Sequence, residues 1–178
     1  GRQNYVVDVI CSSKDNSSIH SKFVNKFFYY NLAKEIDYFK DFINEILKIN
    51  SYDLVVPCHD YWIILLRKYY KYFDKSKVYL LEDKVYKIIN SKIETFKLGK
   101  KLGINQPKSV IFDNKNPCNI SNLKYPLVIK PDSSFSEKNL LYKEVVRIVF
   151  NKEELKNALS EYLSEKFLIQ EFFNGKGC

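Results

Sequence analysis

The 178-residue sequence has little of several residue types: it contains no methionine, five glycines and three arginines. Its apolar runs are also short. The longest begins at Tyr61 and stops before Arg67, whereas a helix that spans a bilayer needs roughly 20 apolar residues. Because such a segment is missing, we expect a cytoplasmic protein with no membrane partner. Because methionine is missing and the chain starts at Gly1, we also expect a piece of a longer protein.

The cysteines are few and far apart, at positions 11, 58, 118 and 178. Zinc sites need ligands at short spacings, and no Cys-x-x-Cys pair is present, so the sequence predicts no metal site in this chain. Reduced thiols are the ordinary state of such cysteines in a cytosolic protein. A catalytic pair formed by Cys58 and His59 is an alternative, but neighbours of this kind more often pack and cap a helix.

What the chain has in excess is lysine. The formal net charge is +8, with 46% apolar and 28% charged residues, which is typical of a globular protein. A positive balance raises the question of nucleic-acid binding. The lysines are scattered singly, however, and arginine, the residue best suited to bidentate contacts with bases and phosphates, is scarce. The sequence therefore argues against nucleic acid as the main partner and keeps it as a third hypothesis.

Residues 1–82 alternate between β-type and helical patterns. Strands are predicted at 5–11, 54–56 and 78–81, and amphipathic or buried helices at 34–49 and 60–73, while the aromatic stretch 23–30 is ambiguous. This order is typical of βαβ units on a parallel sheet, so we predict an incomplete Rossmann-like α/β lobe whose first strand and helix lie upstream. Ligands in such sheets bind at the carboxyl ends of strands, near residues 11–13 and 57–60. We expect Asp60 to cap a helix.

Residues 83–104 read as a helical linker, and residues 105–178 as a small α+β lobe. Ser91 and Glu94 have the spacing of a capping box, and Gly103 marks a left-handed helix stop. Beyond them, strands are predicted at 108–112, 125–131, 140–150 and 167–171. A helix is predicted after Asn151 with an apolar face of Leu155, Ala158, Leu159, Tyr162 and Leu163. The expected architecture is an antiparallel sheet covered by one helix.

Four short segments carry a family resemblance. In chain order they are Asn90-Ser91-Lys92, Leu102–Pro107, Tyr125–Pro131 and Gln170–Gly175. From about residue 53 to the end, their order and spacing resemble the ATP-grasp ligases, especially the carbamoyl-phosphate synthase large-subunit-like and biotin-carboxylase-like members. The resemblance implies that residues 1–82 form the Rossmann-like domain that precedes the ATP-grasp domain. Residues 105–178 then form the small subdomain that clasps adenine, truncated at its C-terminus.

The resemblance assigns the phosphates of ATP to two lysines. Lys92 starts the helix after the linker and Lys130 closes a predicted strand, and lysine supplies a compact charge suited to a polyphosphate. A lysine in the first helical turn opposes the helix dipole, which favours a functional role for Lys92. The family's loop after the second lysine is rich in glycine, but here it contains none. Its candidate phosphate donors are the hydroxyls of Ser133, Ser134 and Ser136, with Lys138 adding charge and Asp132 and Glu137 opposing it.

The resemblance assigns adenine to the last segment, at Gln170, Glu171, Phe172 and Phe173. Backbone groups there can mimic the edge of a base pair, so side-chain identity matters less. Glu171 either accepts the adenine amino group or faces solvent. The two phenylalanines either wall the purine or pack into the core, and we expect the core for one of them.

The family's magnesium ligands and catalytic residues lie beyond Cys178, so the resemblance implies an inactive fragment. The longer protein would be an ATP-dependent ligase that joins a carboxylate to an amine, or to a related nucleophile, through an acyl phosphate. Its ligands would be ATP, Mg²⁺ in the full-length protein, and a carboxylate and amine that the sequence does not identify. A homodimer is left open. A non-catalytic interaction module is the main alternative, favoured by the glycine-free loop.

Overall fold

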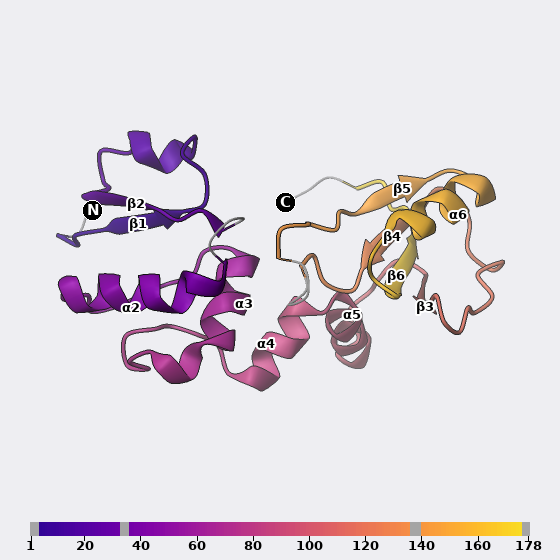
Figure 1. Cartoon of the computed structure of the whole chain (residues 1–178). Coiled ribbons are helices and arrows are strands. Elements are labelled where there is room, and N and C mark those ends of the chain that lie inside the picture. The colour runs from indigo at the N-terminus through magenta and orange to yellow at the C-terminus, as the bar shows by residue number, and fades with distance from the viewer. Residues whose placement is uncertain (1–3, 33–35, 136–139, 176–178) are drawn as a thin grey trace. The chain divides into compact units, whose positions relative to one another are not determined.

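The computed structural model describes residues 4–32, 36–135 and 140–175. The chain divides into two compact units: Gly1–Pro57 with Trp62–Tyr79, and Cys58–Tyr61 with Leu80–Cys178. Together they form a mixed α/β protein with one parallel and one antiparallel sheet, as the sequence predicted (Figure 1).

The sheet of the first unit has two parallel strands, β1 (Asp8–Cys11) and β2 (Lys26–Tyr29). The chain passes between them through the short 3₁₀ helix η1 (Ser17–His20). The aromatic stretch that the sequence left ambiguous therefore contains a strand. The strands predicted at 54–56 and 78–81 are reduced to a single parallel bridge between Val55 and Val78. Val55 makes both bonds of this bridge, with its N–H donating to the Lys77 carbonyl and its carbonyl accepting the Tyr79 N–H.

Among the described residues of the first unit, four helical segments follow the sheet in the chain, and Figure 1 shows α2 (Phe39–Ile49) running alongside it. They are the 3₁₀ turn η2 (Ile36–Tyr38), α2, α3 (Asp60–Lys68) and the 3₁₀ turn η3 (Tyr70–Tyr72). The predicted helix at 60–73 thus ends early, at Lys68. Rings fill the core of the unit: Tyr30 lies 4.4 Å from Phe42 and Phe39 lies 5.6 Å from Trp62, measured between ring centroids.

The second unit begins with α4 (Asp83–Asn90) and α5 (Lys92–Lys101). Ser91 caps α5, because its Oγ accepts the Glu94 N–H at 3.0 Å. The Glu94 carboxylate completes no reciprocal box and instead pairs with Lys97 at 2.7 Å. Gly103 ends the helix with φ at +72°, the left-handed stop that the sequence predicted.

The antiparallel sheet of the second unit has the order β3-β6-β4-β5. Its strands are β3 (Ser109–Asp113), β4 (Leu127–Pro131), β5 (Arg147–Val149) and β6 (Lys166–Glu171), with α6 (Lys152–Glu161) before the last strand. The prediction of an antiparallel sheet is confirmed, and the predicted helix α6 covers one of its faces. The long strand predicted at 140–150 is wrong, since only three residues pair. Leu163, placed by the sequence on the apolar face of α6, follows the helix and is 64% exposed.

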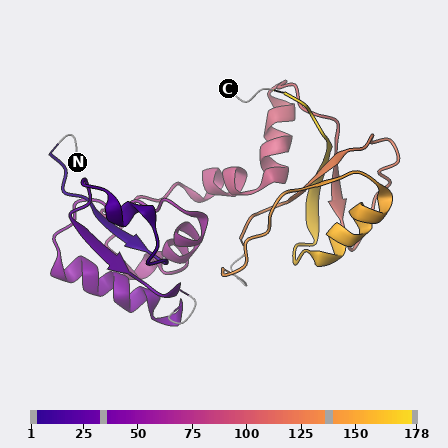
Figure 2. The same ribbon diagram turned by 90° about the horizontal axis from the view of Figure 1, so that it is seen from above.

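The two faces of this sheet differ in their contacts. Leu127, Ile129, Phe167 and Ile169 point to one face and form a buried core with Leu155 and Ala158 of α6. The register places Val128, Lys130, Leu168 and Gln170 on the other face. Figure 2 shows α5 and α6 on opposite sides of the sheet, so the face that carries Lys130 is the side of α5.

Candidate functional site

Asp132, the first residue after β4, fixes the start of α5. Its Oδ1 accepts the Ser91 hydroxyl at 2.6 Å and the Ile93 N–H at 3.0 Å, and its carbonyl accepts the Lys92 N–H at 2.8 Å. All three hydrogen bonds end on Asp132, so this residue holds the start of α5 and the loop after β4 together. The sequence suggested that Asp132 would repel a phosphate. In the structure its carboxylate instead accepts hydrogen bonds from the start of α5.

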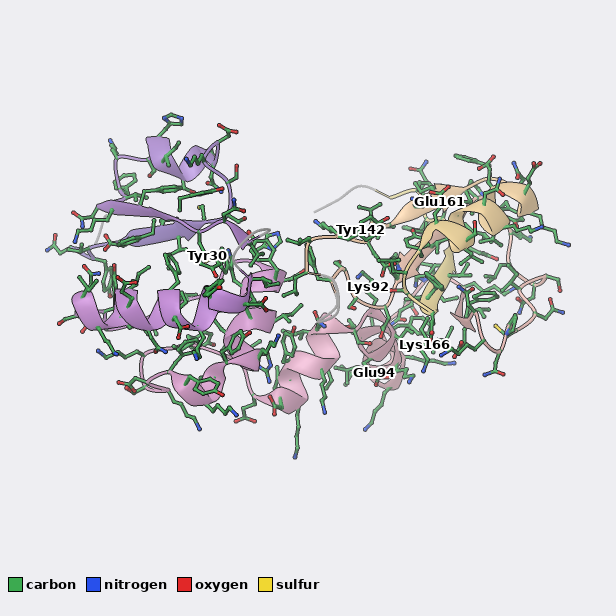
Figure 3. The ribbon with its side chains drawn as sticks, viewed as in Figure 1. Tyr30, Lys92, Glu94, Tyr142, Glu161 and Lys166 are labelled. Carbon is green, nitrogen blue, oxygen red and sulfur yellow. The ribbon has the colours of Figure 1, made fainter. Side chains whose placement is uncertain are left out.

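Lys92 reaches from this helix start into the loop after β4. Its Nζ donates to Ser134 Oγ at 3.3 Å, and its side chain is partly buried. Burial lowers the pKa of Lys92, and the charge of Lys130 lowers it further, while Asp132, Asp60 and Glu144 act in the opposite direction. Figure 3 shows Lys92 and Glu94 on α5, with Lys166 on β6.

Lys130 is the second partly buried amine. It stands on β4, opposite Leu168 of β6, on the sheet face away from α6. Burial lowers its pKa. Because its charge acts on Lys92, the two amines share one environment within the second unit. Two desolvated like charges in one environment are costly to keep ionised unless an anion accompanies them.

The loop after β4 is anchored by side chains. Phe135 is only 8% exposed, and its ring makes edge contacts with His59 at 5.4 Å and Tyr61 at 5.9 Å. Ser133 and Ser134 precede it and are partly buried. Ser136, Glu137 and Lys138 lie outside the described residues. A packed phenylalanine therefore holds this loop at the place where the sequence resemblance leads one to expect glycine.

Glu144 is the one described acid that is buried, with 9% of its surface exposed. Its Oε1 accepts the N–H groups of Leu163 at 2.7 Å and Ser164 at 2.8 Å, and its Oε2 accepts the Ser164 hydroxyl. Its own N–H donates to the Ser134 carbonyl at 2.9 Å. These bonds explain why the predicted strand at 140–150 is short, since the backbone of its first half is bonded elsewhere.

The end of β6 carries the residues that the sequence assigned to adenine. The buried Gln170 donates to Ser109 Oγ at 2.8 Å, and Glu171 Oε1 accepts the Lys124 N–H at 2.9 Å. The Phe172 N–H donates to the Pro126 carbonyl at 2.9 Å. Phe172 is 43% and Phe173 76% exposed, so the expectation that one packs into the core is wrong. Both follow the last strand residue and so lie beyond the faces that the sheet covers.

No family model and no curated protein matches this sequence, but solved structures do. D-alanine–D-alanine ligase from Bacillus anthracis is 19% identical, over 85% of this chain and 48% of its own, with a TM-score of 0.57. An ADP complex of N5-carboxyaminoimidazole ribonucleotide synthetase is 12% identical, over 97% and 42%, with a TM-score of 0.61. L-amino acid ligase from Bacillus licheniformis is 18% identical, over 86% and 34%, with a TM-score of 0.57. The chain has the fold of the ATP-grasp ligases.

The chain spans at most about half the length of these ATP-grasp structures. Within the described ranges, no group of three or more His, Cys, Asp or Glu residues is placed to hold a metal ion. None of the helices among the described residues is long and apolar enough to cross a membrane.

Two residues that shape this candidate site were given other roles from the sequence. Asp132 was expected to oppose the site, and Glu144 was placed in a strand. Both act through partners more than 15 positions away, at Ser91 and Ser164. A signal did exist for Glu144, since it is a single acid within a run of residues that otherwise favours a strand.

Proposed function

We propose that this chain is the ATP-binding part of an ATP-grasp ligase and that Lys92 and Lys130 bind the phosphates of ATP. The observation that carries the proposal is the pair of partly buried amines, Lys92 at the start of α5 and Lys130 on the sheet face away from α6, with the charge of Lys130 acting on Lys92. The fold of the chain supports the same assignment.

The electrostatics favour a polyanion as the ligand. Removing an ammonium group from water costs free energy, and a second ammonium nearby adds to that cost. Asp132 offsets part of it, but its carboxylate also accepts two hydrogen bonds from the start of α5. A triphosphate, with about four negative charges, would supply the missing compensation and would accept charge-assisted hydrogen bonds from both amines.

The serines of the loop extend this phosphate site. Ser134 Oγ already accepts a hydrogen bond from the Lys92 ammonium. A hydroxyl that accepts one hydrogen bond still has a proton to donate, here to a phosphate oxygen. Ser133 lies beside it, and Ser136 belongs to the same proposed set by sequence. The loop would therefore close on the phosphates with hydroxyl groups in place of the backbone of glycines.

Adenine would bind at the end of β6. The Phe172 N–H is bonded to Pro126, so the purine would be read by neighbouring backbone groups of the segment from Gln170 to Phe173. The exposed rings of Phe172 and Phe173 would provide its walls. Gln170 and Glu171 would act by fixing this segment, since their side chains already hold Ser109 and the Lys124 N–H.

The full reaction requires more than this chain. We propose a longer ligase in which the first unit is the Rossmann-like domain and the whole resembles the carbamoyl-phosphate synthase and biotin carboxylase types. ATP would phosphorylate a carboxylate, and an amine or related nucleophile would displace the phosphate from the acyl phosphate. The described residues offer no acidic cluster that fits Mg²⁺, so residues outside them would hold it. The residues of this chain would bind and orient ATP.

Binding of ATP to the full chain, measured by isothermal titration calorimetry, tests the proposal. We expect Lys130→Gln and Lys92→Gln each to weaken binding by about tenfold or more, because each removes a charge-assisted contact. Lys156→Gln on α6 is the matched control, since it removes an exposed lysine on the other side of the sheet and should leave affinity unchanged. Equal binding by all four proteins, or none by the unaltered chain, would refute the site.

The pH dependence gives a second test. Phosphate attraction is lost when a lysine loses its proton, and the pKa of both lysines is lowered by burial. ATP affinity should therefore fall as the pH rises, at a lower pH than for an exposed lysine. Arginine stays protonated throughout this range, so Lys130→Arg should move the fall toward higher pH if it still binds ATP.

A further inference from the structure

We propose that Glu144 is a positioning residue: it holds Ser134 against Lys92 from behind and so sets the affinity of the loop for a nucleotide without touching it. This inference rests on the nucleotide site proposed above. It names a residue for which the sequence gives no role, and it accounts for a phosphate loop that lacks glycine.

The contacts of Glu144 join two separate parts of the second unit. Its carboxylate binds the turn after α6, through Leu163 N, Ser164 N and Ser164 Oγ, and its N–H binds the Ser134 carbonyl. Both carboxylate oxygens are thus satisfied by groups of the same turn. Ser134 is in turn the residue whose hydroxyl accepts from Lys92 Nζ. A continuous chain of hydrogen bonds therefore runs from the turn after α6 to the Lys92 ammonium.

A neighbouring bond strengthens this connection. The Tyr162 hydroxyl donates to the Val145 carbonyl at 2.6 Å, and Tyr162 is itself buried against the core. The segment that follows α6 therefore binds both the side chain of Glu144 and the carbonyl of Val145. Tyr162 belongs to the main core of the second unit. The hydrogen bonds therefore fix the position of Ser134 relative to a rigid part of the fold.

Positioning can be separated from charge because of how the bonds are shared. Both backbone N–H groups bind Oε1, while Oε2 binds only the Ser164 hydroxyl, and a hydroxyl can accept as well as donate. A glutamine can therefore keep the two backbone bonds with its carbonyl and donate its amide to Ser164. Glu144→Gln removes the negative charge and keeps the connection, whereas Glu144→Ala removes both.

The experiment compares ATP binding by the full chain and its variants in isothermal titration calorimetry. We expect Glu144→Ala to weaken ATP binding about tenfold, because the Ser134 carbonyl loses its fixed partner segment, and Glu144→Gln to stay within about threefold of the unaltered chain. Glu161→Ala is the matched control. It also removes an acid that links two elements, through Arg147, but on the α6 side of the sheet, and it should leave affinity unchanged.

Unchanged binding by Glu144→Ala would overturn the proposal while leaving the lysine site in place. Equal losses of ATP affinity in Glu144→Ala and Glu144→Gln would overturn it too, because the cause would then be the effect of the Glu144 charge on Lys92. If the unaltered chain binds no ATP, the nucleotide site fails and this inference fails with it. Should Glu144→Ala not fold, Ser164→Ala takes its place: it removes one of the three bonds and should weaken ATP binding by about threefold, and unchanged binding would overturn the proposal.

Discussion

Phe39 in the first unit and Phe167 in the second are both fully buried, but they are held by different surroundings. Phe39 lies among other rings, at 5.8 Å from Tyr30 and 6.2 Å from Tyr69. Phe167 belongs to a central strand with antiparallel neighbours on both sides, and its core is mainly aliphatic, although the Tyr162 ring lies 5.1 Å away. The first unit thus depends on side-chain packing over a minimal sheet, and the second on a ladder of backbone hydrogen bonds as well.

This contrast bears on function. Binding residues need a rigid base, and Lys92, Lys130 and Ser134 belong to the second unit, near the end of β4 and the start of α5. Among the described residues, the parallel sheet of the first unit has two strands, and a separate bridge joins Val55 to Val78. We therefore expect the second unit to be the more resistant to unfolding.

The largest expected effect comes from truncating the two phenylalanines. Phe39→Ala and Phe167→Ala should each cost about 3–5 kcal/mol of the free energy of unfolding of its own unit. The only tryptophan, Trp62, lies in the first unit and contacts Phe39, so its fluorescence reports that unit during urea unfolding. Phe39→Ala should shift this transition strongly, and Phe167→Ala should not. A shift of equal size in both variants would mean that the units unfold together.

The next effect concerns the start of α5. Ser91→Ala removes the acceptor for the Glu94 N–H and the donor to Asp132, so it should cost the second unit about 1–2 kcal/mol. Hydrogen exchange of the α5 amides would measure this loss. Ser76→Ala is a useful control, because Ser76 also bonds an aspartate, Asp74, but in an exposed turn of the first unit. Exchange in α5 should be unaffected by that control.

A smaller effect is expected at Tyr52, whose hydroxyl donates to Asp8 Oδ2 at 2.6 Å at the start of β1. Burial alone would raise the pKa of Asp8, but hydrogen bonds from Tyr52, Asn25 and the Lys26 N–H outweigh it and lower that pKa. A lowered carboxyl pKa stabilises the fold above its unfolded value of 3.8, and this stability is lost as the pH falls through the folded value. Tyr52→Phe should cost about 1 kcal/mol near neutral pH.

Urea unfolding followed by Trp62 fluorescence at acid pH checks the direction of this pH dependence. The first unit of the unaltered chain should lose stability on acidification, and Tyr52→Phe should lose less between neutral and acid pH because part of the contribution is already absent. Tyr52 adds a change at the alkaline end. Burial and Asp8 raise its pKa, so stability should also fall as the pH rises above the usual tyrosine value of 10.0. A steeper acid loss in the variant would contradict this account.

The smallest effect is expected at Gly103, which ends α5 with φ at +72°. An alanine would find no steric obstacle there, but an L side chain disfavours this backbone conformation, so Gly103→Ala should cost about 1 kcal/mol or less. Urea unfolding followed by far-UV circular dichroism would measure it. Gly103→Asn should cost less than alanine, because asparagine tolerates the left-handed region better.

The features that the sequence predicted well have local causes. Ser91 and Gly103 mark the ends of α5 by bonds and dihedral angles within the same few residues. Asn151 likewise caps α6, with its Oδ1 accepting the Glu154 N–H at 2.9 Å. The two lysines of the proposed site came from a family resemblance in ordered short segments, since neither periodicity nor spacing alone identifies them.

The features that the sequence did not predict depend on distant partners. The segment before β5 has a strand-like composition, yet Glu144 and Val145 bond to Ser134, Ser164 and Tyr162, which only the folded chain brings near. The strand β2, in the stretch that the sequence left ambiguous, pairs with β1, whose residues lie 18 positions earlier. The number of strands in a sheet is likewise a long-range property that no local pattern contains.

The short stretch from Cys58 to Tyr61 has a practical consequence for dissecting this protein. It belongs to the second unit although residues on both sides of it belong to the first, and two of its rings cover Phe135. A protein that begins at Leu80 would therefore lack His59 and Tyr61, the two rings that pack on Phe135 in the loop that carries Ser134. Anyone who wishes to study that loop in isolation must carry these four residues along, because the gene offers no single cut that separates the units cleanly.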